Sequence, residues 1–156
     1  WEKAAGTAQL DAARASGKRL GFTLRVVDFD SADGMFAGLD AAAEGGAQAL
    51  VMLTSPMIST HSRRLAEWTT ARRMPAISPF RAFTDAGGLM SYGPDLVAFR
   101  RFSATYVDRI LKGARPGELP ILQPARFQLV VNKRTAQALG IAFPQALLSW
   151  VDEVIE

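Results

Sequence analysis

Apolar positions along this chain alternate between two patterns, a helical one with a period near 3.6 residues and short runs of strand length. The helical pattern predicts helices over residues 1–16, 31–44, 58–73, 94–112, 133–139 and 144–155, with a single turn at 80–85. The short runs predict strands over residues 22–29, 49–53, 75–77, 89–92 and 127–131. Helices and strands that alternate along most of a chain are typical of an α/β fold with a parallel sheet flanked by helices on both faces.

Two features of this pattern concern the limits of the domain. In a right-handed βαβ unit a strand precedes each crossover helix, yet the helix predicted over 1–16 has no strand before it. The chain also starts with Trp1 rather than Met. We therefore expect a fragment whose first strand, and a segment further upstream, are missing.

Composition narrows the class of protein. The 156 residues are 49% hydrophobic and 21% charged, which is a globular balance, and the net charge is only +3. Arginine pairs at 63–64, 72–73 and 100–101 are interpreted as solvated helix faces, so no nucleic-acid partner is expected. Cysteine is absent, which excludes disulfides and thiolate metal sites. No run is long enough for a membrane span, and no signal peptide is visible.

Motifs of catalysis are missing from the sequence. Neither Gly-x-Ser-x-Gly nor Gly-x-Gly-x-x-Gly occurs, so a nucleophile elbow and a dinucleotide fingerprint are both absent. The single histidine, His61, lies in a predicted helix without a carboxylate at four residues' distance. No nucleophile is paired with a base. We therefore predict no enzyme activity, no catalytic residue, no metal and no cofactor.

Candidate binding residues follow the predicted strands, where an open α/β sheet places its ligand crevice. Hydroxyls can hold a carboxylate, an arginine can pair with one bidentately, and aromatic rings offer flat apolar surface. The candidates of these types are Ser55, Phe80, Arg81, Ser91 and Tyr92. Each also has a structural alternative, as helix cap for the serines, surface charge for the arginine, and core for the aromatic residues.

The stretch Gly88-Leu89-Met90-Ser91-Tyr92-Gly93-Pro94-Asp95-Leu96 joins a short strand to a helix. Pro94 suits the first position of that helix and Asp95 its first turn. This stretch and the residues after it, in particular Tyr106-Val107-Asp108-Arg109-Ile110-Leu111-Lys112-Gly113 and Phe127-Gln128-Leu129-Val130-Val131-Asn132, resemble the substrate-binding proteins of ABC importers. The resemblance is to an uncharacterised family related to tryptophan- and tyrosine-binding components. It covers residues 80–155 closely and residues 1–74 more loosely.

The resemblance implies one lobe of a bilobed periplasmic-binding-protein-like fold of type I. Residues 1–94 would form the second α/β lobe, and residues 95–156 a return segment with a long helix, a Pro-rich connector, a strand and C-terminal helices. The apolar face of 95–125 would then pack on the missing first lobe, or be exposed or oligomerise without it. The chain departs from the family by lacking that lobe and a signal. It also has Thr54-Ser55-Pro56 where many relatives have an acidic residue.

The function that the resemblance implies is solute binding for an ABC importer. A small molecule would lie in an interlobe cleft and be delivered to a membrane permease, with the protein periplasmic or lipid-anchored outside the cytoplasm. Residue types at the strand ends suggest an amino acid or other small carboxylate, aromatic ones included. The alternative is the effector-sensing domain of a transcription regulator or receptor with the same fold. A third interpretation, an α/β enzyme lobe, has no acid–base pair to support it.

Overall fold

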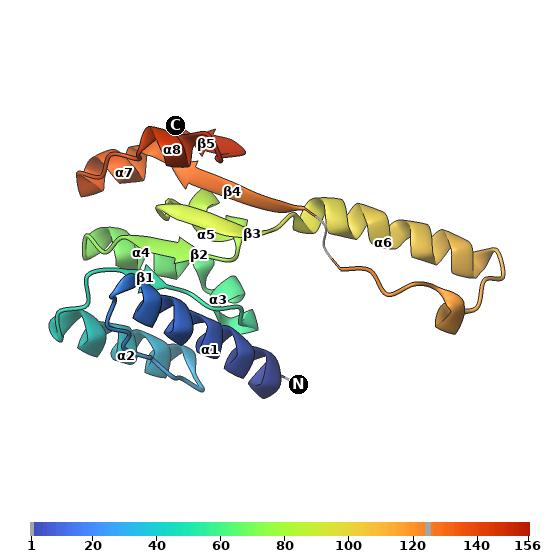
Figure 1. Cartoon of the computed structure of the whole chain (residues 1–156), viewed down its shortest axis with the longest axis horizontal. Helices are drawn as coiled ribbons and strands as arrows, with labels where there is room; N and C mark the ends of the chain where they lie inside the picture. Colours follow the sequence, from blue (N-terminus) through green and yellow to red (C-terminus); the bar gives the residue numbers. More distant parts are fainter. Residues whose placement is uncertain (1, 124–125) are drawn as a thin grey trace.

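The computed structural model describes residues 2–123 and 126–156 (Figure 1). Its longer helices are α1 (Glu2–Leu20), α2 (Ala32–Glu44), α4 (Ser62–Ala71) and α6 (Leu96–Leu111). Its shorter helices are α3 (Pro56–Thr60), α5 (Arg81–Asp85), the 3-10 turn η1 (Pro116–Glu118), α7 (Lys133–Leu139) and α8 (Gln145–Leu148). The strands are β1 (Leu50–Val51), β2 (Ala76–Ser78), β3 (Met90–Pro94), β4 (Phe127–Asn132) and β5 (Glu153–Ile155).

The strands form one five-stranded sheet in the order β1-β2-β3-β4-β5. β1, β2 and β3 are parallel, β4 is antiparallel to β3, and β5 is parallel to β4. The α/β class is confirmed, and the sheet is mixed rather than wholly parallel. The helix predicted through residue 155 is wrong beyond Leu148, because Val154 pairs with Val131 at the far edge of the sheet.

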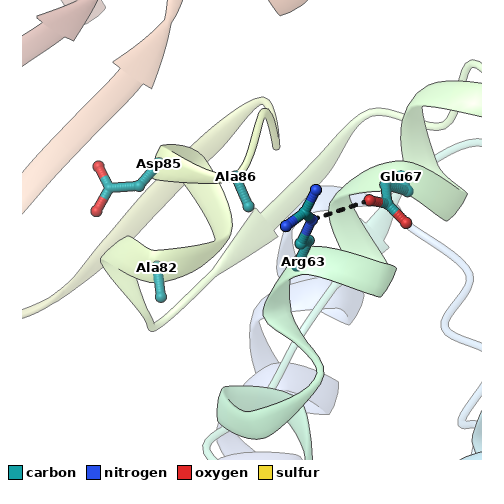
Figure 2. A pocket seen from close by; sticks show the side chains of 5 residues that line it. All are labelled: Arg63, Glu67, Ala82, Asp85 and Ala86. Carbon is teal, nitrogen blue, oxygen red and sulfur yellow. Dashed lines mark hydrogen bonds and ion pairs between the residues drawn. The ribbon is translucent and has the colours of Figure 1, made fainter.

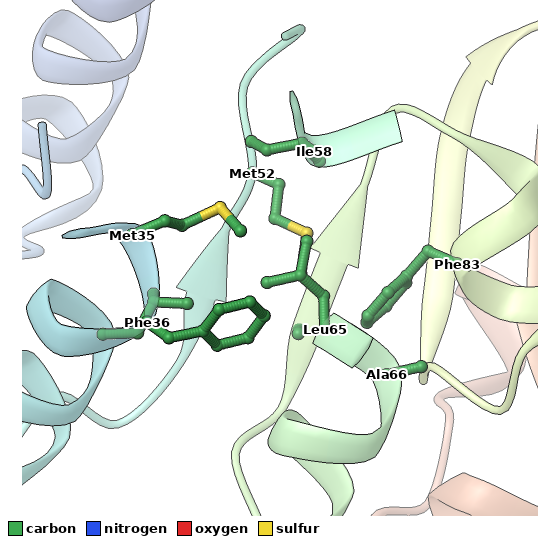
Figure 3. Packing of buried hydrophobic residues seen from close by; sticks show 9 residues of the cluster. Met35, Phe36, Met52, Ile58, Leu65, Ala66 and Phe83 are labelled. Carbon is green, nitrogen blue, oxygen red and sulfur yellow. The ribbon is translucent and has the colours of Figure 1, made fainter. Parts of the chain in front are cut away.

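The core lies between the sheet and helices α2, α4 and α5 (Figure 3). Its buried members are Met35, Phe36, Leu39, Met52, Ile58, Leu65, Ala66, Ala76 and Phe83. At its margin, Asp40 of α2 accepts a hydrogen bond from Trp68 Nε1 at 2.8 Å and pairs with Arg72 at 2.6 Å. The guanidinium of Arg64 lies 3.9 Å from the centre of the Phe36 ring. These polar and cation–π contacts hold α2 against α4 beside the sheet.

The N-terminal segment departs from the sequence prediction in two places. Gly17, expected to end the first helix, is a buried residue within α1, which continues to Leu20. A Cβ at Gly17 would lie 2.9 Å from the Leu24 side chain, so the glycine permits a close approach and Gly21, with φ +76°, follows the helix instead. Residues 22–29, expected as a strand, have no regular secondary structure and belong to no strand of the described sheet.

Two helix boundaries also differ. The helix expected over 58–73 is divided at His61 into α3 and α4. The Nδ1 atom of the His61 ring lies 2.9 Å from the Met57 carbonyl oxygen. Pro94 ends β3 rather than starting a helix. Asp95 is the N-cap of α6, where its carboxylate accepts hydrogen bonds from the N–H groups of Val97 and Ala98.

Helix α6 projects from the sheet together with the connector after it (Figure 1). None of its residues is buried. Its contact with the connector includes the Tyr106 hydroxyl, which donates to the Pro120 carbonyl at 2.6 Å. Within residues 95–156, β4 and β5 therefore complete the sheet, whereas α6 projects away from it. The division into parts at residue 94 stays a prediction.

Candidate ligand-binding site

Three of the predicted site residues follow or end parallel strands, whose carboxyl ends lie at one edge of the sheet. Ser55 follows β1, Phe80 follows β2, and Tyr92 is the central residue of β3, one residue beyond its last pair with β2. Ser55 is half-buried and caps α3, because its hydroxyl accepts a hydrogen bond from the Met57 N–H at 3.2 Å. The structure thus confirms the cap, and a ligand role for Ser55 stays a prediction.

The loop after β2 is held in place by contacts with its own strand and with β3. The buried Ser78 hydroxyl accepts a hydrogen bond from the Phe80 N–H at 3.1 Å. A Cβ on Gly93 would lie 1.9 Å from the Pro79 carbonyl oxygen, so only glycine lets β3 and this loop come so close. Phe80 itself is half-buried and packs against the core cluster. The loop conformation therefore fixes Phe80 near the end of β3.

Tyr92 is the most accessible aromatic residue among the predicted site residues, with 55% of its surface exposed. Its ring lies 5.7 Å from that of Phe127, at an interplanar angle of 31°. The two rings come from adjacent antiparallel strands, on which Tyr92 pairs with Leu129 and Pro94 with Phe127. Sequence reasoning placed Phe127 only at the start of a strand. An exposed aromatic pair of this kind offers a flat apolar surface for another ring or an alkyl group.

Ser91 lies beside Ser78 in the parallel register of β2 and β3, and both side chains are buried. Only 2% of the Ser91 surface is exposed. In this conformation its hydroxyl is therefore shielded from a solute in solvent. A role for Ser91 in binding stays a prediction, and its observed role is packing beneath the site.

Arg81 begins α5 and is already paired with carboxylates. Its Nη1 and Nη2 atoms donate to Glu153 Oε2 and Oε1 at 2.5 and 2.6 Å, and its Nε donates to Asp85 at 3.3 Å. The hydrogen bonds from Arg81 hold the pKa of the Glu153 carboxyl below its usual range. The hydrogen bond to Glu153 is also the main cause that raises the pKa of Arg81.

The bidentate pair of Arg81 and Glu153 joins α5 to the last strand of the sheet. The sequence did not indicate Glu153, because residues 153–155 follow a helical pattern. A free carboxylate would have to compete with Glu153 for the same guanidinium face. A ligand role for Arg81 stays a prediction.

Another hollow among the described residues is lined by charged and alanine side chains. This shallow hollow lies between α4 and α5, and an ion pair of Arg63 and Glu67 at 3.2 Å crosses its wall (Figure 2). Both of those side chains are largely exposed to water. Within residues 2–123 and 126–156 there is no cluster of His, Asp and Glu suited to a metal ion. The helices described in the structure include none long and apolar enough to cross a bilayer.

The family is identified by comparison with known proteins. Residues 3–155 match the family model described as ABC transporter substrate binding protein. The chain belongs to that family. The match extends over both the sheet and the projecting helix. It also includes residues 3–74, in which the sequence resembles the family more loosely. Curated proteins provide no match.

Solved structures show the fold of this family member. A conserved domain protein from Vibrio cholerae and an ABC domain from Streptococcus pneumonia in complex with L-Trp both superpose with a TM-score of 0.84 at 21% identity. Each alignment covers 96% of this chain, and 50% and 52% of those two proteins. A ligand-free, open substrate binding protein with adhesive properties from Clostridium difficile aligns over 96% of this chain and 50% of its own, at 17% identity and a TM-score of 0.62. This substrate-binding family member thus spans about half the length of its structural relatives.

Proposed function

We propose that this chain is one lobe of a solute-binding protein and holds a small molecule against the carboxyl edge of strands β1, β2 and β3. The observation that carries the proposal is the Tyr92–Phe127 pair, two exposed rings 5.7 Å apart at that edge of a substrate-binding family fold. Exposed aromatic surface beside a rigid sheet is typical of binding sites, because it gains burial when a ligand covers it.

The ligand class is inferred from the chemistry of the rings. Tyr92 and Phe127 suit a solute with a ring or an alkyl group, and Phe80 lies in the neighbouring loop. The Streptococcus relative in complex with L-Trp supports an amino acid as the solute. We therefore propose a small apolar or aromatic amino acid, with Tyr92 in contact and Ser55 beside it. Arg81 reaches a ligand carboxylate only by leaving Glu153.

The second wall of the site is assigned to a lobe outside this chain. Apolar side chains on α6 and its connector are exposed, among them Val97, Val107, Leu111, Ile121 and Leu122. Exposed apolar surface of this extent marks an interaction site. We propose that α6 packs on the other lobe, and that the complete protein closes over the solute by hinge motion and delivers it to an ABC permease in the membrane. The complete protein would work outside the cytoplasm and would catalyse no reaction.

Calorimetric titration of the complete, two-lobed protein tests the proposal. Aromatic amino acids, aliphatic amino acids and small sugars are titrated separately at equal concentrations. We expect heat of binding from amino acids and none from sugars. Saturable binding of sugars with no response to any amino acid would contradict the proposed ligand class.

A further inference from the structure

Helix α1 brings a side chain to the loop that follows β1. The Oε1 atom of Gln9, in the first half of that helix, accepts a hydrogen bond from the backbone N–H of Thr54 at 2.9 Å. The two residues are 45 positions apart in the sequence, so the contact is made by the tertiary fold. Thr54 directly precedes Ser55 after β1. Gln9 therefore lies beside a loop that is proposed to contact the solute.

The bond to Thr54 fixes which way the Gln9 amide faces. A backbone N–H only donates, so the atom of the amide that meets it has to be the carbonyl oxygen. The Nε2 atom, with its two donor hydrogens, is then at the other end of the amide. In the part of the chain that the structure describes, Nε2 has no hydrogen-bond partner. The half-buried Gln9 side chain therefore holds an oriented donor that is available to a ligand.

Ser55 presents a second donor in the same loop. Its Oγ atom accepts a hydrogen bond from the Met57 N–H at 3.2 Å, and the side chain is half-buried. A hydroxyl that accepts at its oxygen still carries one hydrogen to donate. Among residues 2–123 and 126–156, no acceptor takes that hydrogen. Two neutral donors are thus anchored to the short stretch from Thr54 to Met57 that follows β1.

Arg81, the predicted site residue with a positive charge, is already paired. Its guanidinium donates to both carboxylate oxygens of Glu153 and to Asp85. Two carboxylates around one guanidinium leave an excess of negative charge, which repels a further carboxylate. The carboxylate of a solute is therefore bound more favourably after β1, where donors are unpaired, than at Arg81, where it would have to displace Glu153.

The spacing of the strands fits this arrangement. Because β2 lies between β1 and β3, these two strands are two strand spacings apart, roughly 9.6 Å. Ser55 follows β1, and the exposed ring of Tyr92 belongs to β3. An aromatic or large aliphatic amino acid has its carboxylate and its apolar group at opposite ends. Such a solute can reach from the donors after β1 to Tyr92 by lying across the end of β2.

We propose that Gln9 Nε2 and the Ser55 hydroxyl bind the carboxylate of the solute, and that Gln9 determines the preference for a carboxylate. The inference rests on the proposed function, an amino acid at the carboxyl edge of β1, β2 and β3, and names the groups that recognise one end of it. Nε2 only donates, so it pairs with a carboxylate and not with the ammonium group. The sequence did not indicate Gln9, because its place at the site depends on the tertiary contact with Thr54.

The substitution Gln9→Glu separates recognition of the solute from the structural contact. The introduced carboxylate still accepts from the Thr54 N–H, but it has no donor and repels a solute carboxylate. We would titrate the complete two-lobed protein with L-tryptophan and L-leucine, and with the carboxamide of each. We expect Gln9→Glu to weaken binding of an amino acid by at least about tenfold. Binding of its carboxamide should stay equal or become stronger, because the carboxamide NH2 group can donate to the new carboxylate.

Gln137→Glu is the matched control. It introduces the same charge on α7, which follows β4 at the opposite edge of the sheet, because β4 runs antiparallel to β3. This variant should bind all four compounds as the wild type does, and both variants should unfold cooperatively at the wild-type midpoint. Equal affinity of Gln9→Glu and the wild type for the amino acid would overturn the inference and leave the proposed function standing. An equal loss for the amino acid and its carboxamide would do the same. Binding of none of the four compounds by the wild type would overturn both.

Discussion

At the scale of single residues, the site depends on close approaches that only particular side chains allow. Gly93 brings β3 against the Pro79 carbonyl and thereby constrains the loop that leads to Phe80. The sequence identified Phe80 and Tyr92 by type and by their place after strands. It did not identify Phe127, since the pairing that places its ring against Tyr92 is a tertiary contact between distant segments. The one signal in the sequence was an aromatic residue at the start of an apolar strand.

Replacing Gly93 by alanine tests this close approach. The new Cβ would lie 1.9 Å from the Pro79 carbonyl oxygen, so β3 and the loop must separate. We expect a loss of about 1–3 kcal/mol in the free energy of unfolding, measured by chemical denaturation. Gly117→Ala is the control, because nothing lies within 4 Å of its added Cβ. Equal stability of the two variants would show that the close approach of β3 to the Pro79 carbonyl does not contribute to the free energy of unfolding.

The Arg81–Glu153 pair predicts a pH dependence of stability. Because the folded pKa of Glu153 lies below its ordinary value of 4.5, the pair stabilises the protein above that value and loses the contribution as pH falls through the folded pKa. Both side chains are nearly half exposed, so Glu153→Gln should cost less than about 1 kcal/mol at pH 7. The difference between wild type and variant, followed by denaturation from pH 7 to pH 2, should vanish at the acid end. A difference that persists unchanged at pH 2 would contradict an ionic pair.

At the scale of elements, the sequence predicted helices better than strands, because a helix pairs its backbone N–H and C=O groups within itself. α2 begins after Ser31, whose hydroxyl accepts a hydrogen bond from Gly34 N–H, and α7 ends at Gly140 with φ +71°, both as the local signals indicate. Strands need partners, and there the prediction was less reliable. Residues 22–29 have strand composition and no partner among the described residues, whereas Glu153–Ile155 follow a helical pattern and become a strand through pairing with β4.

The start of α6 gives a prediction for an element. The Asp95 carboxylate accepts hydrogen bonds from the N–H groups of Val97 and Ala98 at 3.1 and 2.9 Å. No residue of α6 is buried, so packing would not compensate for the loss of this cap. Asp95→Ala should therefore destabilise α6 locally by about 1 kcal/mol, seen as faster amide exchange in its first turn. Asp108→Ala, which removes only the ion pair with Lys112 near the other end, is the control and should leave that turn unchanged. First-turn exchange that is the same in both variants would exclude a capping role.

At the scale of the whole molecule, the structure is a mixed sheet with a helix that projects from it (Figure 1). The family and the α/β class were predicted from the sequence, and the family model and structural relatives confirm both. The sequence could not show that β4 and β5 reverse direction, because an antiparallel return after α6 leaves no mark on the apolar pattern. Several apolar side chains of α6 are exposed, and the packing of residues 95–125 on a lobe outside this chain stays a prediction.

The two tyrosines of the chain allow the most direct test of the binding site. Tyr92 lies at the proposed site, and Tyr106 lies on α6 with its hydroxyl bonded to Pro120. We would measure the affinity of the complete protein for its best-binding amino acid with Tyr92→Ala and with Tyr106→Ala, after confirming that each variant unfolds cooperatively. The account predicts that Tyr92→Ala weakens binding by about tenfold or more, equivalent to at least about 1.4 kcal/mol, while Tyr106→Ala binds as the wild type does. Equal affinities in all three proteins would contradict a solute site at the edge of β1, β2 and β3.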